Sequence, residues 1–134
     1  MEAKTVTDLL RAVEQIGECA FNEVELNWDP SLENNPDKSL IIPSSALVIG
    51  DYSLAFKSDV NYVFINNNPN LIQMHTPFRT LNTDCIIRIP SGTKEGYKAK
   101  FAQYPKIQFV EVALNNELWT GLKDLGYTIP WLNN

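Results

Sequence analysis

The chain has 134 residues, of which 44% are hydrophobic and 20% are charged, and its formal net charge is -5. A chain of this length buries about 70% of the surface that its unfolded form exposes, so one core can form without disulfides or a structural metal. These values exclude a multidomain enzyme and a disordered or fibrous chain. We expect a single domain over residues 1–134.

The overall acidity argues against DNA or RNA as a partner, because the molecule as a whole repels phosphate backbones. The charge is nevertheless uneven: residues 1–59 carry eleven acidic and four basic side chains, whereas residues 60–134 carry five and seven. The longest apolar runs have four residues, so neither a signal peptide nor a membrane span is expected. Cys19 and Cys85 follow no ligand or redox spacing, which favours two thiols in a reducing cytoplasm.

The N-terminal third predicts a helix, a strand and a loop. Apolar residues recur on one stripe over residues 6–16 and Gly17 follows, which indicates an amphipathic helix. Residues 22–28 alternate strictly between polar and apolar, as in a strand with one exposed face. Residues 29–38 have turn composition and no period, so we expect a surface loop.

Short apolar segments separated by turn residues follow this loop at a spacing of roughly ten residues, which favours a meandering antiparallel sheet. The segments are Leu40–Ile42, Ala46–Ile49, Tyr52–Lys57, Tyr62–Ile65, Leu71–Met74, Cys85–Ile89 and Ile107–Val112. A last helix is expected after Asn115 or Asn116, either of which can cap it, with Gly126 as its stop. The predicted fold class is α+β, with a mainly antiparallel sheet or partly closed barrel flanked by an N-terminal and a C-terminal helix.

The sequence lacks a recognisable catalytic or cofactor motif. His75 is the single histidine, and no cysteine or carboxylate stands at ligand spacing from it, so neither a metal nor another cofactor is expected. The run Ser91-Gly92-Thr93-Lys94 has the residue types of a phosphate loop without its glycine spacing. We therefore expect a protein that is not an enzyme, with a small enzyme using His75 as an alternative.

The most distinctive stretch is residues 78–106, which we term the basic–aromatic segment. It holds six of the eleven basic residues against two acidic ones, interleaved with aromatic residues. Basic groups supply anion contacts and aromatic faces stack on nucleobases, and a helix capped by Thr93 would add free amides. Arg79 and Arg88 are the strongest candidates, because a guanidinium matches the geometry of phosphate. The candidate ligand-binding residues are Phe78, Arg79, Asn82, Arg88, Thr93, Lys94, Tyr97 and Lys98.

The same segment has a structural alternative. Tyr97, Phe101 and Tyr104 stand at positions i, i+4 and i+7, so they also fit the buried stripe of a helix. The lysines would then form its solvated face.

Two further surfaces could bind a partner. Acidic residues gather in one N-terminal region, where they could meet a basic protein surface or simply keep an edge strand soluble. They are Glu23, Glu25, Asp29, Glu33 and Asp37. The apolar tail with Trp131 and Leu132 is expected either to dock on the core or to join protomers. A homo-oligomer is slightly favoured, because small binding proteins often build shared sites between protomers.

The leading hypothesis for function is a non-enzymatic protein that sequesters a small phosphate-bearing, nucleotide-like ligand. The alternative is an acidic inhibitor or immunity protein that binds and blocks a protein partner. In size, acidity and lack of a catalytic constellation the chain is similar to small phage-encoded antagonists and toxin-immunity proteins. That similarity implies a viral, anti-defence role in the cytoplasm.

Overall fold

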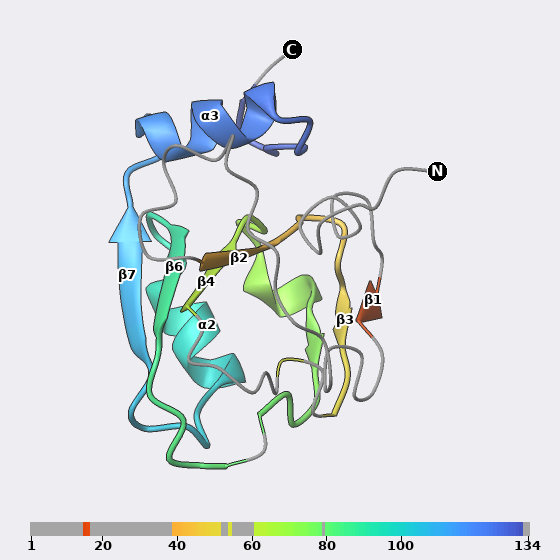
Figure 1. The fold of residues 1–134 in the computed structure, drawn as a ribbon, viewed down its shortest axis with the longest axis vertical. Helices are drawn as coiled ribbons and strands as arrows, with labels where there is room; N and C mark the ends of the chain where they lie inside the picture. Colours follow the sequence, from red (N-terminus) through yellow and green to blue (C-terminus); the bar gives the residue numbers. More distant parts are fainter. Residues whose placement is uncertain (1–14, 17–38, 52–53, 55–60, 79, 133–134) are drawn as a thin grey trace.

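The chain passes repeatedly between two small sheets. The computed structural model describes residues 15–16, 39–51, 54, 61–78 and 80–132 (Figure 1). Sheet A has the order β1-β3-β5, with β1 at Gln15–Ile16, β3 at Val48–Ile49 and β5 at Gln73–Met74. Sheet B has the order β2-β4-β6-β7, with β2 at Ser39–Ile42, β4 at Asn61–Phe64, β6 at Ile86–Pro90 and β7 at Gln108–Val112. The helices are the 3₁₀-helix η1 (Pro69–Leu71), α2 (Lys94–Lys100) and α3 (Glu117–Asp124).

All strand pairs within the described residues are parallel. The predicted antiparallel sheet is therefore wrong, and these residues form two open sheets rather than a partly closed barrel. The cause is the path of the chain: after each strand of sheet B it crosses to sheet A, or to α2, before it returns to sheet B (Figure 1). A hairpin reverses the chain direction between neighbouring strands, whereas a crossover restores it.

From β2 onward successive crossovers have similar lengths, whereas Ile16 of β1 pairs with Ile49 of β3 at a longer offset of 33 residues. In sheet B, Leu40 pairs with Tyr62, Tyr62 with Ile87 and Ile87 with Phe109, which gives offsets of 22, 25 and 22 residues. In sheet A, Ile49 pairs with Met74, 25 residues further along. The described backbone is thus a short solenoid, in which each turn of the chain stacks on the turn before it.

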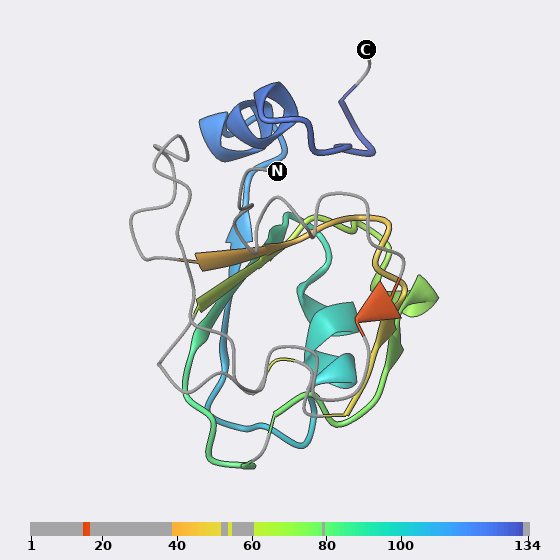
Figure 2. The same cartoon turned by 45° about the vertical axis from the view of Figure 1, so that its right-hand side comes forward.

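The inner core lies between the two sheets and α2 (Figure 2). Side chains of a strand point alternately to the two faces of its sheet. Leu40, Tyr62 and Ile87 of sheet B point inward and share this core with Tyr97 of α2 and with Phe101, which follows the helix. We refer to the opposite side of sheet B as its outer face.

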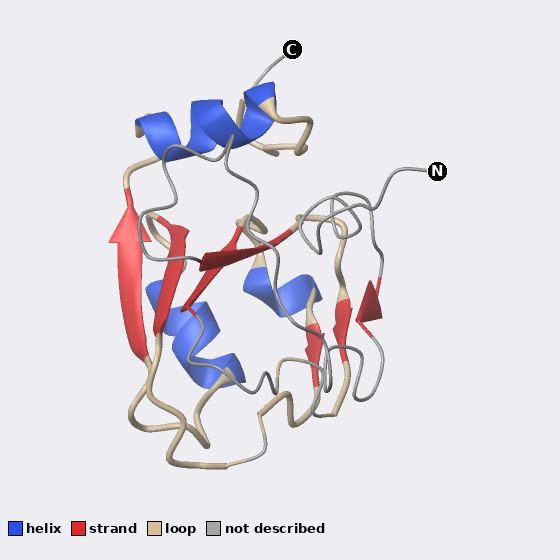
Figure 3. Ribbon diagram, viewed as in Figure 1, coloured by secondary structure: helices blue, strands red, loops and turns tan. Residues whose placement is uncertain are grey.

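Helix α3 covers one part of this outer face (Figure 3). Ile41 and Val63, which are register partners, pack with Leu118, Trp119 and Leu122 of the helix. All five side chains are buried. A second apolar cluster therefore joins the C-terminal region to sheet B.

The predicted C-terminal helix is confirmed, and Asn116 is its cap. The side-chain oxygen of Asn116 accepts a hydrogen bond from the Leu118 amide at 2.9 Å. Gly126, with φ of 101°, follows the end of the helix, and this left-handed conformation favours glycine.

The N-terminal prediction is wrong where it can be compared. Gln15–Ile16 forms strand β1, paired with β3, and not the end of a helix. The remainder of the helix predicted over residues 6–16, the strand predicted at 22–28 and the loop at 29–38 lie outside the described residues. Within the described part of the chain, no helix has the length and apolar content needed to cross a bilayer.

Candidate functional site

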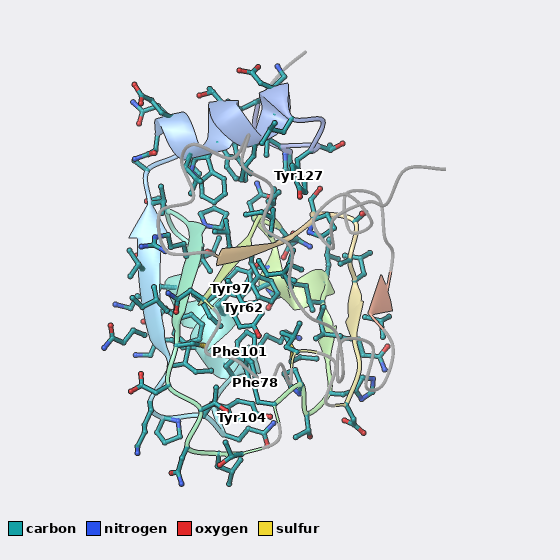
Figure 4. All side chains as sticks on the ribbon, in the orientation of Figure 1. Tyr62, Phe78, Tyr97, Phe101, Tyr104 and Tyr127 are labelled. Carbon is teal, nitrogen blue, oxygen red and sulfur yellow. The ribbon has the colours of Figure 1, made fainter. Side chains whose placement is uncertain are left out.

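The aromatic rings of the basic–aromatic segment lie in the inner core (Figure 4). Phe78 and Tyr97 are only 4% and 0% exposed. The ring of Phe78 meets that of Tyr104 edge to face, with centroids 5.1 Å apart, and the Tyr97 hydroxyl donates to the Asn66 carbonyl oxygen at 2.6 Å. The described geometry does not support stacking of a nucleobase on Phe78 or Tyr97. Tyr97, Phe101 and Tyr104 are all buried, as the structural alternative expected, but only Tyr97 lies within a helix, because α2 ends at Lys100.

Arg88 points away from that core. Its neighbours in β6, Ile87 and Ile89, both belong to the inner core, so Arg88 lies on the outer face of sheet B. There it stands beside its register partners Val63 of β4 and Val110 of β7. Arg88 is half-buried in this position.

The other polar candidates lie elsewhere. Lys94 and Lys98 are exposed on α2, which packs against the inner side of sheet B, so the sheet separates them from Arg88. Asn82 is exposed in a turn, where its backbone amide donates a hydrogen bond to the Thr80 hydroxyl at 3.2 Å. Arg79 lies outside the described residues. The structure therefore does not bring the described basic candidates together in one anion site.

The turn before α2 holds a carboxylate of the chain itself. The Gly92 amide donates to the Glu111 carboxylate of β7. The Thr93 hydroxyl donates to the Pro90 carbonyl oxygen at 2.6 Å and makes no capping bond to an amide of α2. The Glu111 carboxylate thus occupies an amide of this turn, where the sequence predicted a site for the phosphate of a ligand.

The side chain of His75 lies beside that of Gln73 and not beside a carboxylate or a nucleophile of the described residues. It is exposed, and its Nε2 lies 3.2 Å from the Nε2 of Gln73. The nearby Asp51 carboxylate accepts a hydrogen bond from the Thr76 amide at 2.9 Å. Across the described ranges, no three His, Cys, Asp or Glu side chains are grouped as a metal site would require.

Cys85 is a buried free thiol. Burial, and to a smaller extent the charge of Asp84, raises its pKa from 9.0 to about 12. The thiolate is the nucleophilic form of cysteine, so a thiol with this pKa is a poor nucleophile near neutral pH.

Part of the outer face of sheet B is exposed to solvent, and the sequence did not predict this surface. The register places Ile86 beside Gln108 and Arg88 beside Val110, and we refer to these four residues as the outer patch. Val110 is 41% exposed, Gln108 is exposed, and Ile86 and Arg88 are half-buried. The sequence QFVEV of β7 does not alternate between polar and apolar residues, and the neighbours of β7 depend on the strand order.

The C-terminal tail docks on its own chain. Trp131 meets Trp119 edge to face with ring centroids 4.9 Å apart, and its indole nitrogen donates to the Leu114 carbonyl oxygen at 2.9 Å. Leu132 also packs against the outer cluster. Of the two alternatives for the tail, docking on the core is therefore the observed one.

The acidic candidates cannot be placed against this site. They are Glu23, Glu25, Asp29, Glu33 and Asp37, all outside the described residues. The hypothesis that they meet a basic protein surface stays a prediction.

Comparison of the chain with protein-family models, curated proteins and solved structures gives no match.

Proposed function

We propose that this chain is a binding module that contacts a protein partner through the outer patch. The observation that carries the proposal is the pairing of Arg88 with Val110 on an open sheet face, where Val110 is 41% exposed. Arginine is enriched in protein interfaces relative to the rest of the surface. Neighbouring Ile86 and Val110 add apolar surface around it.

A protein partner suits this surface better than a small ligand does. Small-molecule sites are concave and bury most of the ligand, whereas the outer patch lies on the face of a sheet. The rings of Phe78 and Tyr97, which were expected to hold a nucleobase, are buried. The described residues therefore give the nucleotide-sequestering hypothesis no support.

Blocking a partner, as an inhibitor or immunity protein does, needs such a surface and no catalytic group. The buried free thiol of Cys85 suits a reducing compartment. We accordingly propose that this binding module acts in the cytoplasm.

Site-specific photo-crosslinking tests the proposal. A photoreactive amino acid replaces Gln108 in the outer patch or, as a matched control, the exposed Gln103 between α2 and β7. In cells that produce the protein, we expect position 108 to give an adduct with a second protein and position 103 to give none. Arg88→Ala should remove that adduct; no adduct at 108, or the same adduct from both positions, would contradict the proposal.

A further inference from the structure

Strand β7 forms one edge of sheet B. It pairs with β6 on one side, and among the described residues no strand lies on its other side (Figure 1). An edge strand presents unpaired amide and carbonyl groups, which are a template for pairing with another chain.

The hydrogen bonds to β6 show which groups of β7 point outward. The Gln108 amide donates to the Cys85 carbonyl oxygen at 2.9 Å, and the Ser91 amide donates to the Val112 carbonyl oxygen at 3.0 Å. In a parallel pair, alternate residues bond to the same neighbour, so Gln108, Val110 and Val112 are directed to β6. The amides and carbonyls of the residues between them, Phe109 and Glu111, are therefore directed to the open edge.

We propose that β7 pairs in antiparallel direction with β7 of a second copy of this chain, with the two Val110 residues opposite each other. In this register Phe109 of each copy lies opposite Glu111 of the other, which is a hydrogen-bonded position of an antiparallel pair. The outward amides and carbonyls of both residues then find partners. Val110, which is 41% exposed, faces its own counterpart across the two-fold axis.

The charges in β7 agree with this arrangement. Glu111 faces Phe109 of the second copy and not the second Glu111, so like charges do not stand directly opposite. The Glu111 carboxylate is bound by the Gly92 amide of its own chain. Lys106, which is exposed before β7, comes to the far end of the other β7, where α3 begins with Glu117.

The two-fold arrangement also closes the assembly. A parallel pairing of β7 with a second β7 would be head to tail and would leave no common axis, whereas the antiparallel pair is isologous. Because the two-fold axis is perpendicular to the sheet, the outer faces of both copies lie on the same side. The dimer therefore joins two outer patches into one wider surface.

A cysteine substitution tests the register. Directly opposite residues in a non-hydrogen-bonded pair are close enough for a disulfide, so Val110→Cys should give a covalent dimer on mild oxidation. Gln108→Cys, also on the outer face, would lie opposite Val112 and should give no such dimer. The wild-type chain under the same oxidation controls for Cys19 and Cys85. Equal crosslinking of the two variants, or none for Val110→Cys, would overturn the proposal.

A second pair of variants tests the hydrogen bonds. Glu111→Pro removes an outward amide and no bond to β6, and proline is tolerated at an open strand edge. Glu111→Ala keeps the amide and controls for the lost contact with Gly92. In sedimentation equilibrium we expect dimers for the wild type and Glu111→Ala, and a folded monomer by circular dichroism for Glu111→Pro. A monomeric wild type or a dimeric Glu111→Pro would overturn the proposal, and if Glu111→Pro fails to fold, the cysteine variants decide.

These outcomes are separate from the test of the proposed function. An adduct between position 108 and a second copy has the mass of two chains, whereas an adduct with a different protein has another mass. Loss of the dimer would leave the adduct with a different protein intact.

Discussion

Gly96 of α2 faces Pro69 of η1 so closely that a β-carbon at position 96 would overlap the Cγ atom of the proline. Here α2 takes the place that a sheet A strand holds in the preceding turns of the solenoid. Close approach at Gly96 allows the helix to stack on η1 while Tyr97, the next residue, enters the inner core.

Gly96→Ala should therefore destabilise the protein. Alanine favours a helix over glycine by about 1 kcal/mol, but overpacking against a rigid ring costs about 1–3 kcal/mol. We expect a net loss of up to about 2 kcal/mol in the free energy of unfolding, measured by urea denaturation. In a Pro69→Ala background, which removes the Cγ atom, Gly96→Ala should be neutral or stabilising. Equal stability of Gly96→Ala and wild type would mean that the two elements do not meet as described.

The positions of β2 to β7 could be predicted from the sequence, but their partners could not, and β1 falls within a predicted helix. Leu40, Ile41 and Ile42 are all almost fully buried, because inner and outer apolar clusters cover both faces of β2. A run that is apolar on both faces is typical of parallel strands, whereas the expected meander would place consecutive segments side by side. In the structure the strands from β1 to β6 alternate between the two sheets, so each pairs with the strand after next; β6 and β7, which α2 connects, pair directly.

The described candidate residues lie on different sides of sheet B for a related reason. Residues 78–106 are rich in basic and aromatic side chains, and the spacing of the aromatic ones also predicted that they could be buried. Sequence could not show that α2 lies on the inner side of sheet B, because that depends on the crossover direction. As a result, Arg88 and the lysines of α2 were expected together, although the sheet lies between them.

Stability should fall at alkaline pH through Cys85. Burial first, and Asp84 second, raises the pKa of this thiol from 9.0 to about 12. Because the pKa is higher in the folded state, the unfolded chain loses the proton first as pH rises. The contribution to stability is thus complete below pH 9 and is lost as pH rises toward 12.

Urea unfolding at several pH values measures this effect. Between about pH 8 and pH 10, the free energy of unfolding should fall less steeply for Cys85→Ala than for the wild type. The buried hydroxyls of Tyr62 and Tyr97 also have raised pKa values, so both proteins lose further stability at higher pH. Parallel curves for the two proteins below pH 10 would exclude Cys85 as the cause.

Trp131→Ala should destabilise the monomer without changing its assembly. The variant loses the edge-to-face contact with Trp119 and the hydrogen bond to the Leu114 carbonyl oxygen. From the apolar area involved, we expect a loss of about 2–3 kcal/mol and a lower melting temperature. Trp131→Phe keeps a ring but not the indole N–H, so it should lose less. Light scattering should give the wild-type mass for both, and a changed mass would show that the tail joins protomers.

The helix cap offers a comparison between two adjacent asparagines. The Asn116 side chain accepts a hydrogen bond from the Leu118 amide at 2.9 Å, whereas Asn115 is exposed before the cap. Replacing a capping asparagine with alanine typically costs about 1 kcal/mol, because one of the first amides of the helix loses its acceptor. Asn116→Ala should lower the free energy of unfolding by about this amount, and Asn115→Ala should leave it within about 0.5 kcal/mol of wild type. A lower free energy of unfolding for both variants, or for Asn115→Ala alone, would contradict Asn116 as the cap and would place the start of α3 one residue earlier.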